Sequence, residues 1–455
     1  MNTSHLPENE EASGEYQRIA VFGAGLSGQA ARRLAVGLGL EVCLFDEGGQ
    51  GDASVFNRET LGGFDAFIFS PGFAMAHPWR VLAEGSGRPC YSELGFAALH
   101  WRGKLLGVTG TNGKTTITSL LCNALEAAGQ SAVEAGNIGT ALSDCVLGDA
   151  NHEEATAVCE ISSFQAELPL GLQLDGLIWS NFAEDHLDRY GSMAEYFAAK
   201  AQLLTCLRAD APSVLGTDVL AFDPQVAEAR DSLVVDGRCG RGTQGHNNKP
   251  RPYVTEIQNP VLVVALAPES PFRISPQSTN LALVAALWQA LELPAEALIE
   301  SANAFQLAAH RLSPVATWGG VTFWDDSKAT NFHAALAAIN ALDGPIFWIG
   351  GGSGKGGDLD AFARLVGPKI DAAFLYGEVA ESLAASLSSV HSKVEIRADF
   401  VAAVEAATRA ALADSPSVVL LSPGFASFDQ FSGYAARGKT FISTVFSLKD
   451  AHRPN

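Results

Sequence analysis

The stretch KLLGVTGTNGKTTITSLLCNALEAAG, residues 104–129, decides the fold of this chain. An apolar strand runs into a glycine-rich loop, and the residues after the loop form a helical pattern. Small residues in such a loop let backbone N–H groups approach phosphates, and Lys114 can reach the outer phosphates of a nucleotide. Thr115 can offer its hydroxyl to Mg²⁺ at the helix start. Val108 stands where the general P-loop pattern has its first glycine, so a turn with a surface lysine is the alternative.

Two strands downstream, TAVCEIS (residues 156–162) and GLIWSN (residues 176–181), end at polar residues. Glu160 closes the first strand, where a phosphate-bound Mg²⁺ would need an oxygen ligand. His186, in the polar run after the second strand, could bind a metal or orient a substrate, although a single histidine is more often structural. Lys200 has apolar neighbours and is expected to be partly buried rather than on a solvated helix face.

Upstream of the loop, RIAVFGAGLSGQAARRLAVGLGLEVCLFDE, residues 18–47, reads as strand, glycine turn, helix and strand. Gly23, Gly25 and Gly28 form a G-x-G-x-x-G, and Asp46 ends the second strand. Alone this pattern fits an NAD-binding fingerprint and therefore an NAD-dependent dehydrogenase. A tight turn or a different nucleotide fits it equally well. DAFIFSPG, another strand, ends at a Ser-Pro-Gly turn.

A third α/β unit begins near residue 310, with four predicted strands, VTFWDD, PIFWIGG, AAFLYG and SVVLLSPG. Arg311 suits bidentate phosphate contact, and the loop of residues 325–331 mixes groups that can grip a nucleotide and an amino acid. The glycine loop GGSGKGGD, residues 351–358, follows a strand and carries Lys355, so an anion such as a carboxylate could bind there.

Length and composition agree with three domains in a 455-residue chain. The net charge of −20 argues against a nucleic-acid or anionic-membrane surface. The seven cysteines show no C-x-x-C pair, and no signal peptide or membrane-length apolar run is found, so we expect a cytoplasmic protein. Residues 237–253 read as an exposed loop.

Taken together, the motifs resemble those of the Mur ligases, and most closely the members that add glutamate. The resemblance spans about residues 18–448 and rests on TGTNGKTT, EISSFQAE, EDHLDRY, an AAK, DDSKATN, GGSGKGGD and LLSPGFASFDQF, in the family's order. It implies a fold of class α/β with three domains: a Rossmann-like N-terminal domain, a P-loop ATPase-like central domain and a Rossmann-like C-terminal domain. The predicted ranges are 1–103 for binding the UDP precursor, 104–309 for ATP, and 310–455 for glutamate and ATP.

The resemblance also implies the reaction. ATP phosphorylates the L-alanine carboxylate of UDP-N-acetylmuramoyl-L-alanine, and the amine of D-glutamate then displaces phosphate. The implied catalytic residues are Lys114, Glu160, His186 and Lys200. Two Mg²⁺ ions are expected, with Thr115, Glu160, His186 and Lys200 as ligands and Lys200 as a CO₂-derived carbamate. The implied ATP contacts are Gly110, Thr111, Asn112, Gly113, Lys114, Thr115, Thr116, Asn280, Arg311 and Asp326.

The first domain, by the same resemblance, binds UDP rather than a dinucleotide. The implied precursor contacts are Leu26, Ser27, Asp46, Ser70, Gly72, Asn137, Ser162 and His186. The implied glutamate contacts are Thr330, Lys355, Ser427, Phe428 and Tyr434. The chain departs from the family at Gln277, at Ser353 in place of Asp, and at Phe428 and Tyr434 in place of Leu and Phe.

Other functions stay open on sequence alone. A folylpolyglutamate synthase-like ligase shares the short P-loop and the lysine carbamate, and the first glycine motif allows a dehydrogenase. A non-catalytic nucleotide-binding regulator is disfavoured by the intact lysines, glutamate and histidine. We expect a monomer.

Overall fold

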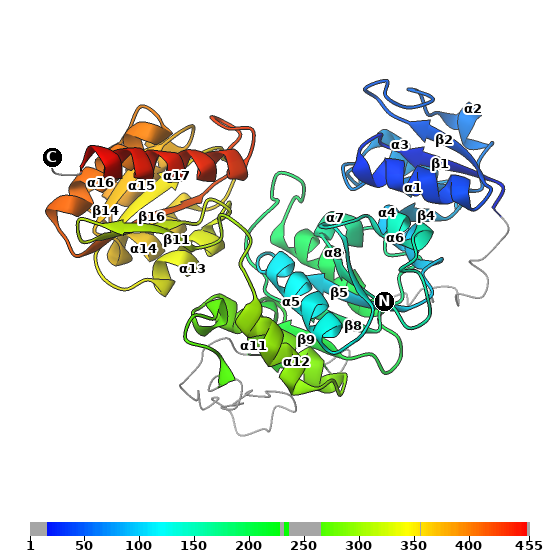
Figure 1. Ribbon diagram of the computed structural model, residues 1–455. Helices are drawn as coiled ribbons and strands as arrows, with labels where there is room; N and C mark the ends of the chain where they lie inside the picture. Colours follow the sequence, from blue (N-terminus) through cyan, green and yellow to red (C-terminus); the bar gives the residue numbers. More distant parts are fainter. Residues whose placement is uncertain (1–15, 228–231, 236–264, 355, 453–455) are drawn as a thin grey trace. The chain divides into compact units, whose positions relative to one another are not determined.

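The computed structural model describes residues 16–227, 232–235, 265–354 and 356–452. It has three separate sheets with helices packed against them (Figure 1), as the α/β prediction requires. The chain divides into two compact units. Residues 1–182, 194–272 and 278–305 form the first unit, which contains two sheets. Residues 183–193, 273–277 and 306–455 form the second, which contains the third sheet.

The first sheet has four parallel strands in the order β2-β1-β3-β4. A dense aromatic cluster lies against it, with the Phe22 ring stacked on Phe45 and on Phe69. Gly28 packs so closely that a Cβ there would collide with the carbonyl oxygen of Gly23. The elements of this region are β1 (Arg18–Phe22), α1 (Leu26–Gly37), β2 (Glu41–Phe45), α2 (Arg58–Leu61), β3 (Ala66–Phe69), α3 (Pro78–Glu84), β4 (Cys90–Ser92) and α4 (Glu93–Ala98).

The second sheet has six parallel strands in the order β10-β9-β8-β5-β7-β6. Its central strand β5 leads directly into α5, whose buried side chains Ile117, Leu120 and Leu121 join one core with α11 and α12. The elements are β5 (Lys104–Thr109), α5 (Lys114–Ala127), β6 (Ala132–Gly136), α6 (Leu142–Leu147), β7 (Thr156–Glu160), α7 (Ser163–Ala166), β8 (Gly176–Trp179), α8 (Met193–Thr205), β9 (Ser213–Gly216), α9 (Thr217–Phe222), β10 (Leu233–Val235), η1 (Pro271–Arg273), α11 (Gln277–Ala290) and α12 (Ala295–Ala304).

The third sheet has the order β11-β12-β16-β13-β14-β15, in which only β11 is antiparallel to its neighbour. Helices α13, α14 and α15 contribute to the core on one face, and α16 and α17 to the core on the other. The elements are β11 (Ser313–Trp318), β12 (Val321–Asp325), α13 (Phe332–Ala341), β13 (Ile346–Gly351), α14 (Leu359–Val366), η2 (Gly367–Lys369), β14 (Ala372–Tyr376), α15 (Ala380–Ser388), β15 (Val394–Ile396), α16 (Phe400–Ala413), β16 (Ser417–Gly424) and α17 (Tyr434–Ala451).

The strands predicted from apolar runs are confirmed, and the strand-loop-helix at residues 104–129 is β5 followed by α5. The predicted exposed loop at residues 237–253 lies outside the described residues. Within the described part of the chain, no helix is long and apolar enough to cross a membrane.

Candidate active site

The glycine loop after β5 needs glycine at two positions. Gly110 and Gly113 have φ angles of +145° and +82°, which side-chain-bearing residues rarely adopt. A Cβ on Gly113 would also lie 2.5 Å from Oδ1 of Asn280, so the start of α11 closely approaches the loop. Asn280, a predicted ATP contact, therefore lies beside Gly113, another predicted ATP contact.

The end of β8 holds the middle of this loop in place. The Ser180 hydroxyl donates to the carbonyl oxygen of Asn112 at 2.6 Å. The Asn181 side chain accepts from the Asn112 N–H at 2.8 Å and donates to its carbonyl oxygen at 3.0 Å. The Thr111 N–H donates to the Asn181 carbonyl. The loop conformation is thus fixed by a neighbouring strand end.

Glu160 meets the first turn of α5 at the end of the adjacent strand. It is 2% exposed, and its carboxylate accepts from the Thr115 hydroxyl at 2.8 Å and from Asn137 Nδ2 at 2.9 Å. The contact follows from the sheet, because Glu160 pairs with Val108 of β5 and with Gly136 of β6. Three predicted site residues, Thr115, Glu160 and Asn137, are therefore brought together.

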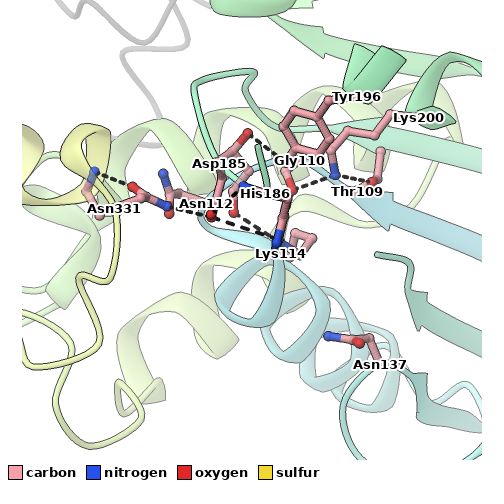
Figure 2. A network of polar contacts seen from close by, with 12 residues as sticks. Thr109, Gly110, Asn112, Lys114, Asn137, Asp185, His186, Tyr196, Lys200 and Asn331 are labelled. Atoms are coloured by element: carbon pink, nitrogen blue, oxygen red, sulfur yellow. Dashed lines mark hydrogen bonds and ion pairs between the residues drawn. The ribbon is translucent and has the colours of Figure 1, made fainter. Parts of the chain in front are cut away.

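Two lysine amino groups converge on one carbonyl oxygen of the loop (Figure 2). Lys114 Nζ donates to the Gly110 oxygen at 2.9 Å, and Lys200 Nζ donates to the same oxygen at 3.0 Å. Lys200 is 1% exposed, and its Nζ lies 3.3 Å from Thr109 Oγ1 and 5.1 Å from the centre of the Tyr196 ring. The predicted burial of Lys200 is confirmed, and Lys114 brings a positive charge to the loop, as a phosphate site requires.

The donor set at the loop suits a hard cation. Among the described residues, no group of three or more His, Cys, Asp or Glu side chains is placed to hold a metal ion. The Thr115 hydroxyl and the Glu160 carboxylate are oxygen ligands of the kind Mg²⁺ accepts. Because Mg²⁺ keeps several waters and takes substrate phosphates, one or two protein oxygens are sufficient.

Ser162 and Gln165 form a capping box at the start of α7. The Ser162 hydroxyl accepts from the Gln165 N–H, while Gln165 Oε1 accepts from the Ser162 N–H. This reciprocal cap fixes the chain two residues beyond Glu160.

Asp46 and Ser70, two of the predicted precursor residues, contact the glycine turn after β1, and Leu26 starts the helix that follows it. Asp46 Oδ2 accepts from the Ala24 N–H at 2.9 Å, and this bond, followed by one from Gln50, holds the pKa of Asp46 below its ordinary value. The Ser70 hydroxyl donates to the Gly23 carbonyl oxygen, and Leu26 at the start of α1 is 92% exposed. Asp46 thus serves as an anionic cap of the turn, which the NAD-binding interpretation did not anticipate.

The second unit holds a buried acidic loop after β12. His310 Nδ1 lies 2.6 Å from Asp325 Oδ2. Asp326 accepts from the Leu312 N–H at 3.0 Å and from the Ser422 hydroxyl at 2.8 Å. Burial outweighs these bonds and raises the pKa of Asp326 to about 7.

The segment of residues 183–193 packs within the second unit, although the sequence places it directly after β8. Asp185 Oδ1 accepts from the His186 N–H, and Asp185 Oδ2 accepts from Asn331 Nδ2 at 3.1 Å. A pocket opens here, lined by Glu184, Asp185, Leu187, Thr330, Asn331, Phe332, Gly356, Gly424 and Phe425. Of the predicted glutamate residues, Thr330 lines it.

The other predicted glutamate residues have different settings. Ser427 is buried, whereas Phe428 is 73% exposed. The Tyr434 ring lies under the amino group of Lys328, with 3.9 Å from Nζ to the ring centre. Lys355 lies outside the described residues.

Comparison with known proteins agrees with this geometry. The model of the Mur ligase middle domain matches residues 108–236, and that of the Mur ligase glutamate ligase domain matches residues 310–425. The UDP-N-acetylmuramoylalanine--D-glutamate ligase of Phenylobacterium zucineum is 33% identical, over 96% of this chain and 97% of the relative. The chain belongs to the Mur ligase family. A relative of the same name from Frankia casuarinae is 35% identical, over 94% of this chain and 93% of its own length.

Two solved ligase structures share the fold of this chain. MurF from Acinetobacter baumannii aligns with a TM-score of 0.57 at 17% identity, covering 83% of this chain and 84% of that protein. A pseudomurein peptide ligase type C from Methanothermus fervidus aligns with a TM-score of 0.56 at 17% identity, covering 94% of this chain and all of that protein.

One residue of this Mur ligase that sequence reasoning missed is Arg437 in α17. Its guanidinium is fully buried and donates to the Ser327 hydroxyl and carbonyl, to the Tyr376 hydroxyl, and to the carbonyls of Phe425 and Ala426. It therefore ties the acidic loop to the end of β16. A basic residue in the first turn of an otherwise apolar helix face was the available signal, but its partners are distant in sequence.

Proposed function

We propose that this Mur ligase joins D-glutamate to UDP-N-acetylmuramoyl-L-alanine at the expense of ATP. The γ-phosphoryl group of ATP passes to the L-alanine carboxylate and ADP leaves. The glutamate amine then attacks the acyl phosphate, inorganic phosphate leaves, and the amine loses a proton as the amide forms. The observation that carries the proposal is the hydrogen bond between Thr115 and buried Glu160, beside a loop that faces two lysines. The names of the curated relatives supply the substrates.

The loop residues would hold the nucleotide. Backbone N–H groups of a glycine loop at a helix start bind phosphate oxygens, and Lys114 can exchange its carbonyl partners for a phosphate. Mg²⁺ would offset phosphate charge during transfer. Thr115 and Glu160 would hold that ion. The assigned ATP contacts are Gly110, Thr111, Asn112, Gly113, Lys114, Thr115, Thr116, Asn280, Arg311 and Asp326.

Lys200 is proposed to carry a carbamate. The ammonium first loses a proton, the neutral amine attacks CO₂, and the adduct loses a second proton, so a cation becomes an oxygen-bearing anion. The support is the position of Lys200: its side chain is buried, and its Nζ lies within hydrogen-bond distance of Thr109 Oγ1 and the Gly110 carbonyl oxygen, at the base of the glycine loop. We assign His186 and this carbamate to a second Mg²⁺.

We assign the substrate-binding residues from the motifs that resemble those of the family. We assign the UDP precursor to residues 1–103, ATP to residues 104–309, and glutamate together with ATP to residues 310–455. We propose that the enzyme is monomeric and cytoplasmic. The precursor residues are Leu26, Ser27, Asp46, Ser70, Gly72, Asn137, Ser162 and His186. The glutamate residues are Thr330, Lys355, Ser427, Phe428 and Tyr434.

The test is phosphate release with ATP and UDP-N-acetylmuramoyl-L-alanine, offering D-glutamate, L-glutamate, meso-diaminopimelate and L-lysine separately. We expect release with D-glutamate alone and a product heavier by one glutamyl residue in mass spectrometry. Folate with L-glutamate serves as a control for the folylpolyglutamate alternative. Release with another amino acid or with folate, and none with D-glutamate, would overturn the proposal.

A further inference from the structure

Arg80 forms a buried ion pair between α3 and the end of α7. Its side chain is 3% exposed, and its Nη1 donates to Glu167 Oε2 at 2.6 Å, while the Glu167 side chain is fully buried. The same Nη1 donates to the Phe73 carbonyl oxygen at 3.2 Å, and Nε donates to Glu84 at 2.8 Å. The two residues are 87 positions apart in sequence, so the pair is a long-range contact.

One end of this pair holds the turn that follows β3. The Phe73 N–H donates to the Ser70 carbonyl oxygen, so the Ser70–Phe73 segment is a tight turn whose last carbonyl is bound by Arg80. Ser70 in turn donates to the carbonyl oxygen of Gly23 in the glycine turn. Arg80 thereby reaches the residues proposed to bind the UDP part of the precursor.

The other end holds the helix that follows Glu160. Glu167 is the C-cap of α7, and its N–H donates to the carbonyl oxygens of Ser163 and Gln165. Gln165 forms the capping box with Ser162, two residues after the carboxylate that accepts from Thr115. Glu167 is therefore connected through one short helix to the proposed phosphoryl-transfer site.

We infer that Arg80 and Glu167 are positioning residues that set the distance between the UDP-binding turn and the phosphoryl-transfer site. The inference rests on the proposed function, in which one long substrate must reach from the uridine end to the γ-phosphate of ATP. Charge-assisted hydrogen bonds of a guanidinium are short and directional, so a buried Arg–Glu pair with further hydrogen bonds fixes the relative positions of the groups that it joins. Neither residue touches the substrate in this role.

This positioning role predicts that the kinetic constants for the precursor change while KM for ATP does not. Loss of the pair shifts the two ends of the precursor site relative to each other, so KM for the precursor rises and kcat falls. The ATP loop is held by Ser180 and Asn181 instead, so KM for ATP at saturating precursor stays unchanged. A residue needed only for stability would alter neither constant in the folded fraction.

The test uses the full chain with the double substitution Arg80→Met/Glu167→Leu, because replacing both partners by apolar groups avoids a buried unpaired charge. We expect a melting temperature within a few degrees of wild type and a fall in kcat/KM for the precursor of about tenfold to a hundredfold, since a shift of ~1 Å costs about a hundredfold. Arg80→Lys, which keeps the charge, is expected to recover part of the loss. If the double variant does not fold, Arg80→Lys alone is the test, because an ammonium cannot reproduce the guanidinium geometry that joins Glu167, Glu84 and the Phe73 carbonyl; kcat/KM for the precursor should then fall severalfold, and a wild-type value would overturn the inference.

The matched control is Arg33→Gln/Asp144→Asn. This pair also links the first sheet's helices to those of the second, from α1 to α6, by two hydrogen bonds of 2.8 Å, but it is partly exposed and contacts no proposed site. We expect wild-type kinetics. Wild-type precursor KM and kcat in the Arg80 double variant, or an equal rise in KM for ATP, would overturn the inference. Failure of wild-type enzyme to use D-glutamate would instead refute the proposed function.

Discussion

Replacing Asp326 by asparagine should change how the stability of the second unit depends on pH. The carboxyl group is buried, and burial raises its pKa to about 7, while an unfolded aspartate titrates near ~3.9. Between these values the folded unit binds more protons than the unfolded chain. The free energy of unfolding therefore falls as pH rises through this interval, opposite to the usual behaviour of a salt-bridged aspartate.

The size of the effect follows from the pKa difference. Each pH unit is worth about 1.4 kcal/mol, and from pH 5 to pH 8 about two units of the interval are crossed, which gives about 3 kcal/mol. The asparagine side chain would have nearly the same shape, could accept from the Leu312 N–H and could donate to the Ser422 hydroxyl. The Asp326→Asn variant should therefore gain about 3 kcal/mol relative to wild type between pH 5 and pH 8.

The assay is urea unfolding of both proteins at pH 5 and pH 8, followed by tryptophan fluorescence without ligands. Trp324 and Trp348 lie on strands β12 and β13 of the second unit, and the tryptophans of the first unit are the same in variant and wild type. Titrations of other groups cancel in the difference between variant and wild type. Asp343→Asn, at an exposed carboxylate in the same unit, is the control for replacing an aspartate by asparagine without burial. A difference for Asp326→Asn that does not vary with pH would refute the reasoning.

Three further changes test the proposed site. Glu160→Gln should lower kcat by at least about a hundredfold, because it removes a charged oxygen from the Mg²⁺ site, and raising Mg²⁺ should restore part of the activity in steady-state assays. Lys200→Ala should inactivate the enzyme, and adding a short-chain carboxylic acid should recover some turnover if a carbamate oxygen is what is missing; unaided wild-type turnover would contradict the metal assignment. Tyr434→Phe should leave KM for D-glutamate within about twofold, because the Lys328 cation contacts the ring face and not the hydroxyl; a tenfold rise would show that the hydroxyl binds substrate.

The sequence was sufficient for elements with strong local patterns. Central strands such as β5 and β16 are continuous apolar runs, which a strand buried on both faces requires. Short edge strands such as β4 and β15, of three residues each, carry too few residues for a period to show. The burial of Lys200 was predicted because its neighbours on one helix are apolar.

The sequence names candidate site residues one by one, but it does not give the contacts among them. Glu160 and Asn137 come together because β6 pairs with β7, and that register is a property of the sheet rather than of either segment. Arg80 meets Glu167 through a contact between α3 and the end of α7, and the two residues are 87 positions apart in sequence. Asp185 is nearest in sequence to β8 yet bonds Asn331 in the second unit, which no local pattern indicates.

The partners of Arg437 have a consequence for synthesis of the protein. The loop at Ser327 and the turn at Phe425 are anchored by a guanidinium that the ribosome adds 110 residues after Ser327 and 12 residues after Phe425. During synthesis, the acidic loop therefore lacks its hydrogen bonds to Arg437 until α17 has been made. Deletion of α17 would therefore remove the hydrogen bonds of a loop that lies 110 residues earlier in the sequence.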